Sequence, residues 1–307
     1  MKEEHLPILT ICIPTYNRAK ILRENLMGIN EQLKAIDTNE VELIVSDNCS
    51  PDNTFDVVAS MKELGLPIVY NRNEENIGAD RNFLKCMHLA RGKYVYLLGD
   101  DDFLEDNAIK RLLDVLRGKN YGLVYIDTRH ELDGSVKEYQ DRSEFIKKVS
   151  YFYTFMSGCI FRSAAINRVE REDRYIATCL LQMPFYLQST LMFDTNAVIT
   201  FPVIKQVGAD ASNNGGYNYF EVFVKNYLTI LGEYIEDKKL FSWLKKDIWH
   251  FVWMYTRRLL IDKIVGNFKT DNGWKILFKY YGNEWYFWWT LFKYPFGTVK
   301  RKIMKML

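Results

Sequence analysis

Short apolar runs alternate with segments of helical periodicity through the first 130 residues of the chain. The short runs are bounded by polar residues, which is typical of strands. The segments between them repeat their apolar positions every three or four residues, which is typical of helices. The expected strands are 8–13, 41–45, 68–70, 94–98 and 124–127, and the expected helices are one with apolar positions from Ile21 to Leu33 and others near 53–64, 80–90 and 106–117.

This alternation predicts an α/β fold, with a mostly parallel sheet covered by helices on both faces. Ser50 is expected to cap the second helix, with Pro51 at its first position. Beyond residue 127 we expect a polar stretch at 129–148, an aromatic strand or pair of strands ending at Phe161, and a helix near 180–193.

A flexible break at Asn213–Gly216 precedes a third of the chain that has mainly helical periodicity. This last part contains all seven tryptophans of the sequence. We therefore expect two domains, an α/β domain at 1–217 and a helical, basic, tryptophan-rich region at 218–307.

The charge of the chain is distributed unevenly. The whole sequence has 41 basic and 39 acidic side chains, but residues 1–237 hold 26 basic and 35 acidic ones and residues 238–307 hold 15 and 4. The first part is thus unlike a basic nucleic-acid binder, and the last is suited to a different, anionic partner. The low content of glycine and proline, 17 and 7 residues, excludes collagen-like and wholly disordered chains.

The cysteines and the apolar runs bear on the compartment. The five cysteines are widely spaced and never form a Cys-x-x-Cys pair, so we expect reduced thiols. The apolar run near the amino terminus is short and broken by Pro14, which is unlike a secretory signal. No stretch approaches the roughly 20 apolar residues that a transmembrane helix needs. A cytoplasmic protein is expected.

Polar residues follow three of the predicted strands, at 14–18, 46–48 and 99–102. In an open parallel sheet, ligands bind beyond the carboxyl ends of the strands. The simpler alternative is that Asn17 and Asp106, like Ser50, are helix caps and that the remaining acids are solvated.

Three consecutive aspartates, Asp100–Asp102, are hard to explain as solvated loop residues. Like charges about 4 Å apart repel by roughly 4 kcal/mol at an effective dielectric constant near 20. The three carboxylates therefore need a nearby cation, or their pKa values must be raised. Oxygen ligands suit Mg²⁺ or Mn²⁺, which are held by one or two carboxylates together with substrate phosphates. The sequence has neither a P-loop nor a Gly-x-Gly-x-x-Gly after the first strand, which disfavours P-loop enzymes and dinucleotide-binding dehydrogenases.

Four motifs in order, at 11–18 (ICIPTYNR), 44–50 (IVSDNCS), 76–82 (NIGADRN) and 92–102 (GKYVYLLGDDD), resemble family 2 glycosyltransferases of the GT-A fold. The sequences of these motifs are most similar to those of bacterial O-antigen and capsule enzymes of the abequosyltransferase type. The resemblance implies a GT-A fold, Rossmann-like with a mostly parallel sheet, and a nucleoside-diphosphate sugar as donor.

The resemblance also assigns roles to individual residues. It places Asp47 against the donor base, with Asn48 beside it, Asp100 toward the ribose, and Asp102 on the metal. Arg81 would lie in the same cleft, or else form an ion pair with Asp80 or Asp101. The implied nucleotide-sugar-binding residues are Pro14, Thr15, Tyr16, Arg18, Asp47, Asn48, Arg81 and Asp100, and the implied catalytic residues are Asp101 and Asp102, of which Asp102 is also the metal ligand.

The family's usual acidic pair is missing from the start of the helix near 180–193. The segment 178–186 has no carboxylate, and Glu172, Asp173 and Asp194 do not match the motif. The general base and the stereochemical outcome, inverting or retaining, therefore stay open.

Residues 285–307 combine aromatic and basic side chains and contain no acid. Tryptophan prefers bilayer interfaces, and lysine and arginine are attracted to anionic head groups. We expect this segment to contact a membrane, whereas Trp243, Trp249 and Trp253 are expected to pack within the helical region. The residues concerned are Trp285, Tyr286, Phe287, Trp288, Trp289, Lys293, Lys300, Arg301, Lys302 and Lys305.

The leading hypothesis is a metal-dependent enzyme that uses Mn²⁺ or Mg²⁺ to move a sugar from a nucleoside-diphosphate sugar to a glycan. Its expected partners are a polyprenyl-diphosphate-linked acceptor and an anionic membrane surface, not nucleic acid. It would be peripheral on the inner face of the cell membrane. The alternatives are a nucleotidyltransferase and a catalytically inactive scaffold that binds nucleotide sugars.

Overall fold

The computed structural model describes residues 6–127, 133–205, 216–263 and 267–293. The chain divides into two compact units, Met1–Ala209 and Asp210–Leu307. The expected boundary at residue 217 stays a prediction, because most of the break at Asn213–Gly216 lies outside the described residues.

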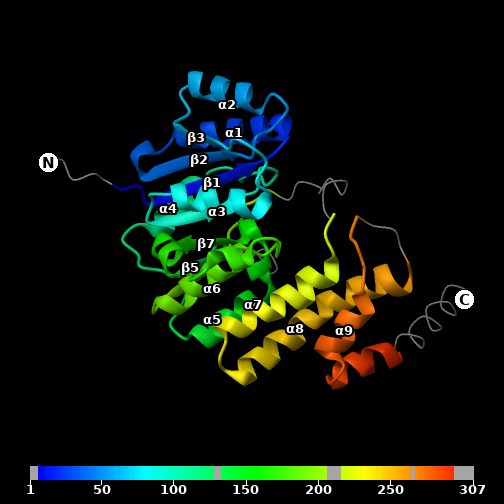
Figure 1. Cartoon of the computed structure of the whole chain (residues 1–307). Coiled ribbons are helices and arrows are strands. Elements are labelled where there is room, and N and C mark those ends of the chain that lie inside the picture. The colour runs from blue at the N-terminus through cyan, green and yellow to red at the C-terminus, as the bar shows by residue number, and fades with distance from the viewer. Residues whose placement is uncertain (1–5, 128–132, 206–215, 264–266, 294–307) are drawn as a thin grey trace, which may run out of the picture. The chain divides into compact units, whose positions relative to one another are not determined.

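The first unit is built on one sheet of eight strands in the order β3-β2-β1-β4-β7-β5-β8-β6 (Figure 1). Strands β3, β2, β1 and β4 are parallel, β7 is antiparallel to both of its neighbours, and β6 is antiparallel to β8. The expected α/β architecture is thus confirmed. The strands are β1 (Leu9–Thr15), β2 (Val41–Asp47), β3 (Ile68–Arg72), β4 (Tyr94–Leu97), β5 (Leu123–Ile126), β6 (Val136–Tyr139), β7 (Cys159–Arg162) and β8 (Asn196–Ile199).

Helices cover both faces of this sheet, and β1 shows why its residues form a continuous apolar run. Leu9, Ile11 and Ile13 pack in one core with helices α1, α2 and α4, while Cys12 points to α3, where its Sγ donates to the carbonyl of Cys86. Both sides of the strand are buried, as a parallel sheet requires. The helices of this unit are α1 (Ala19–Leu33), α2 (Thr54–Glu63), α3 (Ala79–Leu89), α4 (Ala108–Leu116), α5 (Arg142–Val149) and α6 (Gln182–Met192).

Two sequence predictions on this unit are wrong. The polar stretch expected at 129–148 was given no strand or helix, but its described part contains β6 and most of α5, and the Asp141 carboxylate caps α5 through the amides of Ser143 and Glu144. Helix α2 begins at Thr54 instead of Pro51, its N-cap is Asn53 instead of Ser50, and the Asp52 carboxylate accepts a hydrogen bond from the Thr54 amide. The same carboxylate accepts a hydrogen bond from the amide of Ala19 at the start of α1.

The second unit consists of helices packed through aromatic side chains. Tyr219 is buried among the rings of Phe220, Phe223 and Tyr255. Trp249 is also buried and donates its indole N–H to Thr290. The elements are a π-helical turn Glu221–Asn226, α7 (Tyr227–Tyr234), α8 (Lys238–Thr256), a second π-helical turn Arg257–Ile261, α9 (Gly273–Tyr281) and a helix at 285–293. Among the described residues of the chain, no helix combines the length and the apolar character needed to cross a membrane.

Candidate functional site

A cleft of about 540 Å³ opens at the carboxyl ends of β1 and β4. It brings together residues from five separate segments of the chain. Seven of the residues expected at the site line it, whereas Asp47, Arg81 and Asp102 do not. The lining residues are Pro14, Thr15, Tyr16, Arg18, Asn48, Asn76, Gly78, Ala79, Asn82, Phe83, Gly99, Asp100, Asp101 and Met156.

Asp100 is the buried anchor of this cleft, with 4% of its surface exposed. Its Oδ2 accepts a hydrogen bond of 2.7 Å from the Thr15 hydroxyl, and its Oδ1 accepts one of 2.7 Å from Nη1 of Arg18. The same Arg18 nitrogen lies 3.1 Å from Oδ2 of Asp101. Burial raises the pKa of Asp100, and the charge of Arg18 offsets part of that rise. Arg18 therefore compensates two of the three adjacent carboxylates.

Asp102 is stabilised by a hydroxyl instead of a cation. Its Oδ2 accepts a hydrogen bond of 2.5 Å from Oγ of Ser157. The Ser157 Oγ in turn accepts a hydrogen bond of 2.9 Å from the amide of Gly99. Burial raises the pKa of Asp102, the Ser157 hydroxyl lowers it, and the charge of Asp101 raises it further. Asp102 is thus held directly behind the cleft.

The carboxylates of Asp101 and Asp102 converge on the space that Gly99 leaves open. A Cβ at position 99 would lie 2.7 Å from Oδ2 of Asp102 and 3.1 Å from Oδ1 of Asp101. Within the described ranges, no group of three or more His, Cys, Asp or Glu side chains could hold a metal ion. Two carboxylates nevertheless fit Mg²⁺ or Mn²⁺, because such ions are held by one or two carboxylates when substrate phosphates complete the shell. Asp101 and Asp102 are the residues that would hold the ion.

The turn that presents these aspartates is fixed by residues that the sequence analysis did not identify. The side-chain amide of Asn25 donates to the carbonyl oxygens of Gly99, Asp100 and Asp102, over 3.1 to 3.3 Å. The Tyr96 hydroxyl donates to the carbonyl of Ser157 over 3.0 Å. A polar residue among Leu22, Leu26 and Ile29, on the apolar face of α1, was the available signal for Asn25.

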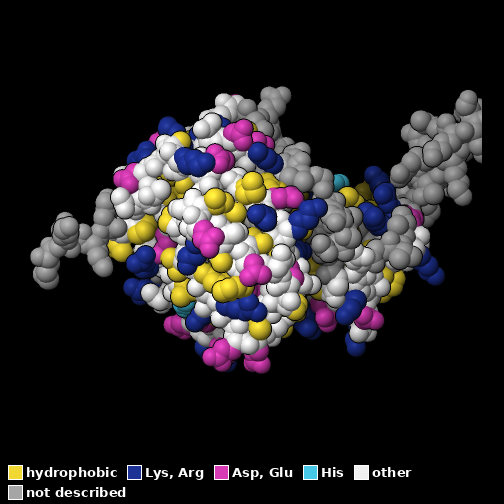
Figure 2. Space-filling model, turned by 90° about the horizontal axis from the view of Figure 1, so that it is seen from above, with side chains coloured by type: hydrophobic (Ala, Val, Ile, Leu, Met, Phe, Trp, Pro, Cys, Tyr) yellow, Lys and Arg dark blue, Asp and Glu magenta, His cyan; other side chains and the backbone are white. Residues whose placement is uncertain are grey.

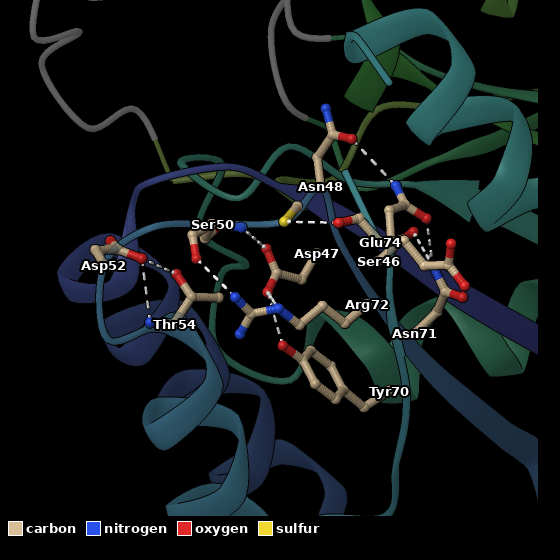
Figure 3. Close-up of polar contacts among 12 residues, drawn as sticks. Ser46, Asp47, Asn48, Ser50, Asp52, Thr54, Tyr70, Asn71, Arg72 and Glu74 are labelled. Atoms are coloured by element: carbon tan, nitrogen blue, oxygen red, sulfur yellow. Dashed lines mark hydrogen bonds and ion pairs between the residues drawn. The ribbon is translucent and has the colours of Figure 1, made fainter. Parts of the chain in front are cut away.

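Asp47 lies in a separate polar cluster at the ends of β2 and β3 (Figure 3). Its side chain is fully buried. Its Oδ1 accepts from the Ser50 amide over 2.8 Å, and its Oδ2 accepts from the Tyr70 hydroxyl over 2.7 Å, with Nε of Arg72 at 3.8 Å. Burial, and next the hydrogen bond to Asp47, raises the pKa of Tyr70. Both oxygens are used within the protein, so the role of Asp47 at a donor base stays a prediction.

Asn48 is the residue after β2 that faces the cleft. Its side-chain oxygen accepts from the amide of Ile77 over 2.9 Å, and its side-chain nitrogen donates to Oδ1 of Asn76 over 2.8 Å. These bonds hold the loop before α3 against the end of β2. Asn48 thereby shapes one wall of the cleft.

Arg81 is exposed at the start of α3, and within the described part of the chain it forms no ion pair with Asp80 or Asp101. Asp80 is instead buried, and its Oδ2 accepts from the amide of Cys179 over 3.3 Å. Burial raises the pKa of Asp80, and the backbone amides of residues 177–179 offset part of that rise. Asp80 therefore ties α3 to the loop that precedes α6.

Helix α6 begins at Gln182 and has no acid in its first turn. Of the acids near it, Glu172 lies 2.8 Å from Nε2 of His88, and Asp194 lies 3.1 Å from the guanidinium of Arg142. Both are thus paired with basic side chains. The general base, missing from the sequence motif, is not assigned to any of these groups.

Comparison with known proteins finds bacterial glycosyltransferases among the relatives of this chain. The chain is 31% identical over 175 residues to "Abequosyltransferase RfbV" of Salmonella typhimurium, covering 56% of this chain and 48% of that protein. It is 28% identical over 195 residues to "GalNAc(5)-diNAcBac-PP-undecaprenol beta-1,3-glucosyltransferase" of Campylobacter jejuni, covering 60% of this chain and 62% of that protein. The matched part is thus less than two thirds of the length of either relative.

Among solved structures, S. aureus TarS 1-349 in complex with UDP is similar in fold. It has a TM-score of 0.62 and 16% identity, and the match covers 86% of this chain and 76% of that one. The family model described as "Glycosyl transferase family 2" matches residues 10–171, more than half of this sequence. That range contains all four motifs and the residues of the cleft, and the chain belongs to glycosyl transferase family 2.

Proposed function

We propose that this protein is a metal-dependent glycosyltransferase that moves a sugar from a nucleoside-diphosphate sugar to a glycan acceptor. The observation that carries the proposal is the cleft where Arg18, Asp100 and Asp101 meet, with Asp102 directly behind it. Family membership and the named activities of the two relatives support glycosyl transfer. UDP in the TarS structure supports a nucleotide donor.

The residues of the cleft suit the two ends of such a donor. Tyr16 is 43% exposed at the cleft, and its ring is available to stack on a base. Arg18 presents a positive charge held in place by Asp100, where a diphosphate would develop negative charge as the sugar leaves. A bound Mn²⁺ or Mg²⁺ supplies further positive charge at the diphosphate. Asp101 and Asp102 would hold that ion.

On the face drawn in Figure 2, basic and acidic side chains are interspersed. Proteins that bind nucleic acid instead gather lysine and arginine on one face. The face drawn in Figure 2 shows no such gathering of basic side chains.

The acceptor proposed here is lipid-linked, and the protein would be cytoplasmic and peripheral on the inner membrane face. The second unit exposes Trp285, Trp288, Trp289 and Phe292, which are between 49% and 65% exposed. Lys293 lies 4.4 Å from the ring centre of Trp289. Exposed aromatic rings with adjacent lysines fit the interface of an anionic bilayer. Of the expected membrane segment, Lys300, Arg301, Lys302 and Lys305 lie outside the described residues.

Donor binding is tested by thermal unfolding with UDP, GDP, CDP or dTDP, each with and without Mn²⁺. A ligand that binds only the folded protein raises the unfolding temperature by mass action. We expect one nucleotide to do so, more strongly with Mn²⁺, and Asp102→Asn to lose the Mn²⁺-dependent part. Asp106→Asn, at an exposed aspartate paired with Lys205, is the matched control.

Turnover separates an enzyme from an inactive binder. Release of nucleoside diphosphate from the matching sugar nucleotide, measured with glycan acceptors and polyprenyl-diphosphate-linked ones, is expected only with an acceptor. Binding without release under all of these conditions would favour the inactive scaffold. If none of the four nucleotides binds, the proposed donor site itself is refuted.

Membrane contact is tested by sedimentation with phosphatidylglycerol vesicles. The double variant Trp285→Ser, Trp289→Ser is expected to bind at least about tenfold more weakly, because burial of each ring is worth about 1.5–3 kcal/mol. Phe55→Ser, at an exposed ring of the first unit, is the matched control. Equal sedimentation of the double variant and the wild type would contradict the proposal.

A further inference from the structure

A second cleft, of about 720 Å³, lies at the edge of the sheet opposite the donor cleft. The segments before β1 and β4 line it, together with the segment after β7. Because β7 runs antiparallel to β4, its carboxyl end lies at the amino-terminal edge of the parallel strands. This cleft is therefore separate from the site formed by Asp100–Asp102, which follows the other end of β4.

Two cations of this cleft, Lys93 and Arg162, lie against the same aromatic ring. Nζ of Lys93 lies 5.6 Å from the ring centre of Tyr94, and Cζ of Arg162 lies 5.3 Å from the same ring centre. Among the described residues, neither side chain has a carboxylate within ion-pair distance. Nζ of Lys93 donates to the carbonyl of Lys119 over 2.5 Å, and Nη1 of Arg162 donates to Oδ1 of Asn120 over 2.9 Å.

The other charged side chains of the cleft are already paired. Arg91 forms an ion pair of 2.7 Å with Glu42, and His88 lies 2.8 Å from Glu172. Among the described residues, Lys93 and Arg162 are thus the two cations of the cleft without an acidic partner. Both cations lie against the ring of Tyr94. Burial lowers the pKa of Lys93, and the charge of Arg162 lowers it further.

The guanidinium of Arg162 packs against two aromatic rings. Its guanidinium lies 5.2 Å from the ring centre of Phe193 as well as against Tyr94. Its backbone amide donates to the Ser189 hydroxyl over 3.0 Å. A fixed guanidinium beside a lysine is a good receptor for an anion, because both groups donate charge-assisted hydrogen bonds.

Part of the remaining wall of the cleft is apolar. It includes Leu6, which is 60% exposed, together with Ile8, Leu116 and Ile166. A ligand that filled the cleft would place one end on the two cations and the other on these side chains. Two positive charges match the charge of a phosphate monoester, which is about −1.5 to −2 at neutral pH, better than they match a carboxylate.

We propose that this cleft is a second ligand site, which binds a phosphate monoester carrying an apolar group through Lys93 and Arg162. The site is independent of the donor cleft. The phosphate comes either from a soluble ester or from a lipid head group, and the two sources have the same chemistry at the protein.

The test is isothermal titration calorimetry of the full chain with n-octyl phosphate, inorganic phosphate and the neutral n-octyl glucoside. We expect n-octyl phosphate to bind most tightly and n-octyl glucoside not to bind. Lys93→Gln is expected to weaken n-octyl phosphate binding at least about tenfold, since a charge-assisted hydrogen bond is lost. Lys62→Gln, at an exposed lysine of α2, is the matched control and is expected to bind as the wild type does.

Two further variants protect the result against misfolding and against binding elsewhere. Lys93→Glu places a carboxylate beside Arg162, so it is expected to abolish binding without lowering the unfolding temperature. Tyr16→Ser alters the donor cleft at a side chain that is 43% exposed, and it is expected to keep n-octyl phosphate binding. Binding within about twofold of the wild type in both Lys93 variants would overturn the proposal, as would its loss in Tyr16→Ser.

Vesicles distinguish the two sources of phosphate. Binding to phosphatidic acid in phosphatidylcholine vesicles that is lost in Lys93→Glu identifies a lipid head group. Binding of n-octyl phosphate without such vesicle binding identifies a soluble ester. Either result supports the site, and neither depends on sugar transfer, so a failure here is distinct from a failure of the proposed function.

Discussion

Replacing Ser157 by alanine tests whether one hydroxyl holds the acidic turn in place. Its Oγ accepts from the amide of Gly99 and donates to Asp102, and its backbone carbonyl is fixed by Tyr96. Alanine keeps the backbone and removes both side-chain bonds. We expect the turn at residues 99–102 to open locally while the rest of the sheet stays folded.

The magnitude follows from the two lost partners. The Gly99 amide becomes a buried donor without an acceptor, which costs about 1–3 kcal/mol. Asp102 loses a hydrogen bond to a charged group, worth about 1.5–3 kcal/mol, part of which water can replace because Asp102 is not fully buried. We expect the free energy of unfolding of the first unit to fall by about 2–4 kcal/mol.

The assay has to report the unfolding of the first unit. All seven tryptophans lie in the last third of the sequence, so tryptophan fluorescence reports the second unit. Hydrogen exchange of the segment 94–104 measures local opening at the Gly99 amide, and far-ultraviolet circular dichroism in urea measures unfolding of the whole chain. In Ser157→Ala the Gly99 amide is expected to exchange about 30-fold to 1,000-fold faster.

Ser60→Ala is the control, because the Ser60 hydroxyl donates only to the carbonyl of Val57 in its own helix. It is expected to change stability by no more than about 0.5 kcal/mol. The reasoning fails if Ser157→Ala is as stable as Ser60→Ala and its Gly99 amide stays protected. In that case the turn would be held by its bonds to Asn25, Thr15 and Arg18.

Three other substitutions probe the same unit. Arg18→Gln leaves the buried Asp100 without its cation, so urea unfolding is expected to show a loss of about 2–4 kcal/mol, and an unchanged midpoint would contradict it. Burial raises the pKa of Asp80, so its contribution to stability is present at low pH and is lost as the pH rises through that raised pKa. The stability of Asp80→Asn relative to the wild type is therefore expected to increase as the pH rises above about 4, and a difference that does not change with pH would contradict this. Gly99→Ala adds a Cβ 2.7 Å from Asp102 and is expected to weaken the Mn²⁺-dependent thermal shift, unlike Gly28→Ala, where the space is open.

The strands that carry the site could be predicted from the sequence because each is an apolar run buried on both faces. β1, β2 and β4 therefore stand out locally, as do the polar residues at their ends. Ser157 could not be predicted in this way, since it lies 55 residues from Asp102 and nothing near it marks a functional position. β6 was missed because three of its four residues are exposed and it reads as a polar loop.

The three adjacent aspartates, the strongest signal in the sequence, are accommodated by the protein in three different ways. Asp100 is neutralised by Arg18, Asp102 is held by Ser157, and Asp101 keeps 48% of its side chain in solvent. The turn can therefore fold without a divalent ion. An ion held by only these two carboxylates would take its further ligands from water and, in the proposed function, from the diphosphate of the donor. Nucleotide and Mn²⁺ should then strengthen each other's binding by the same factor, as linkage requires, and titrations in which each leaves the other's affinity unchanged would refute this account.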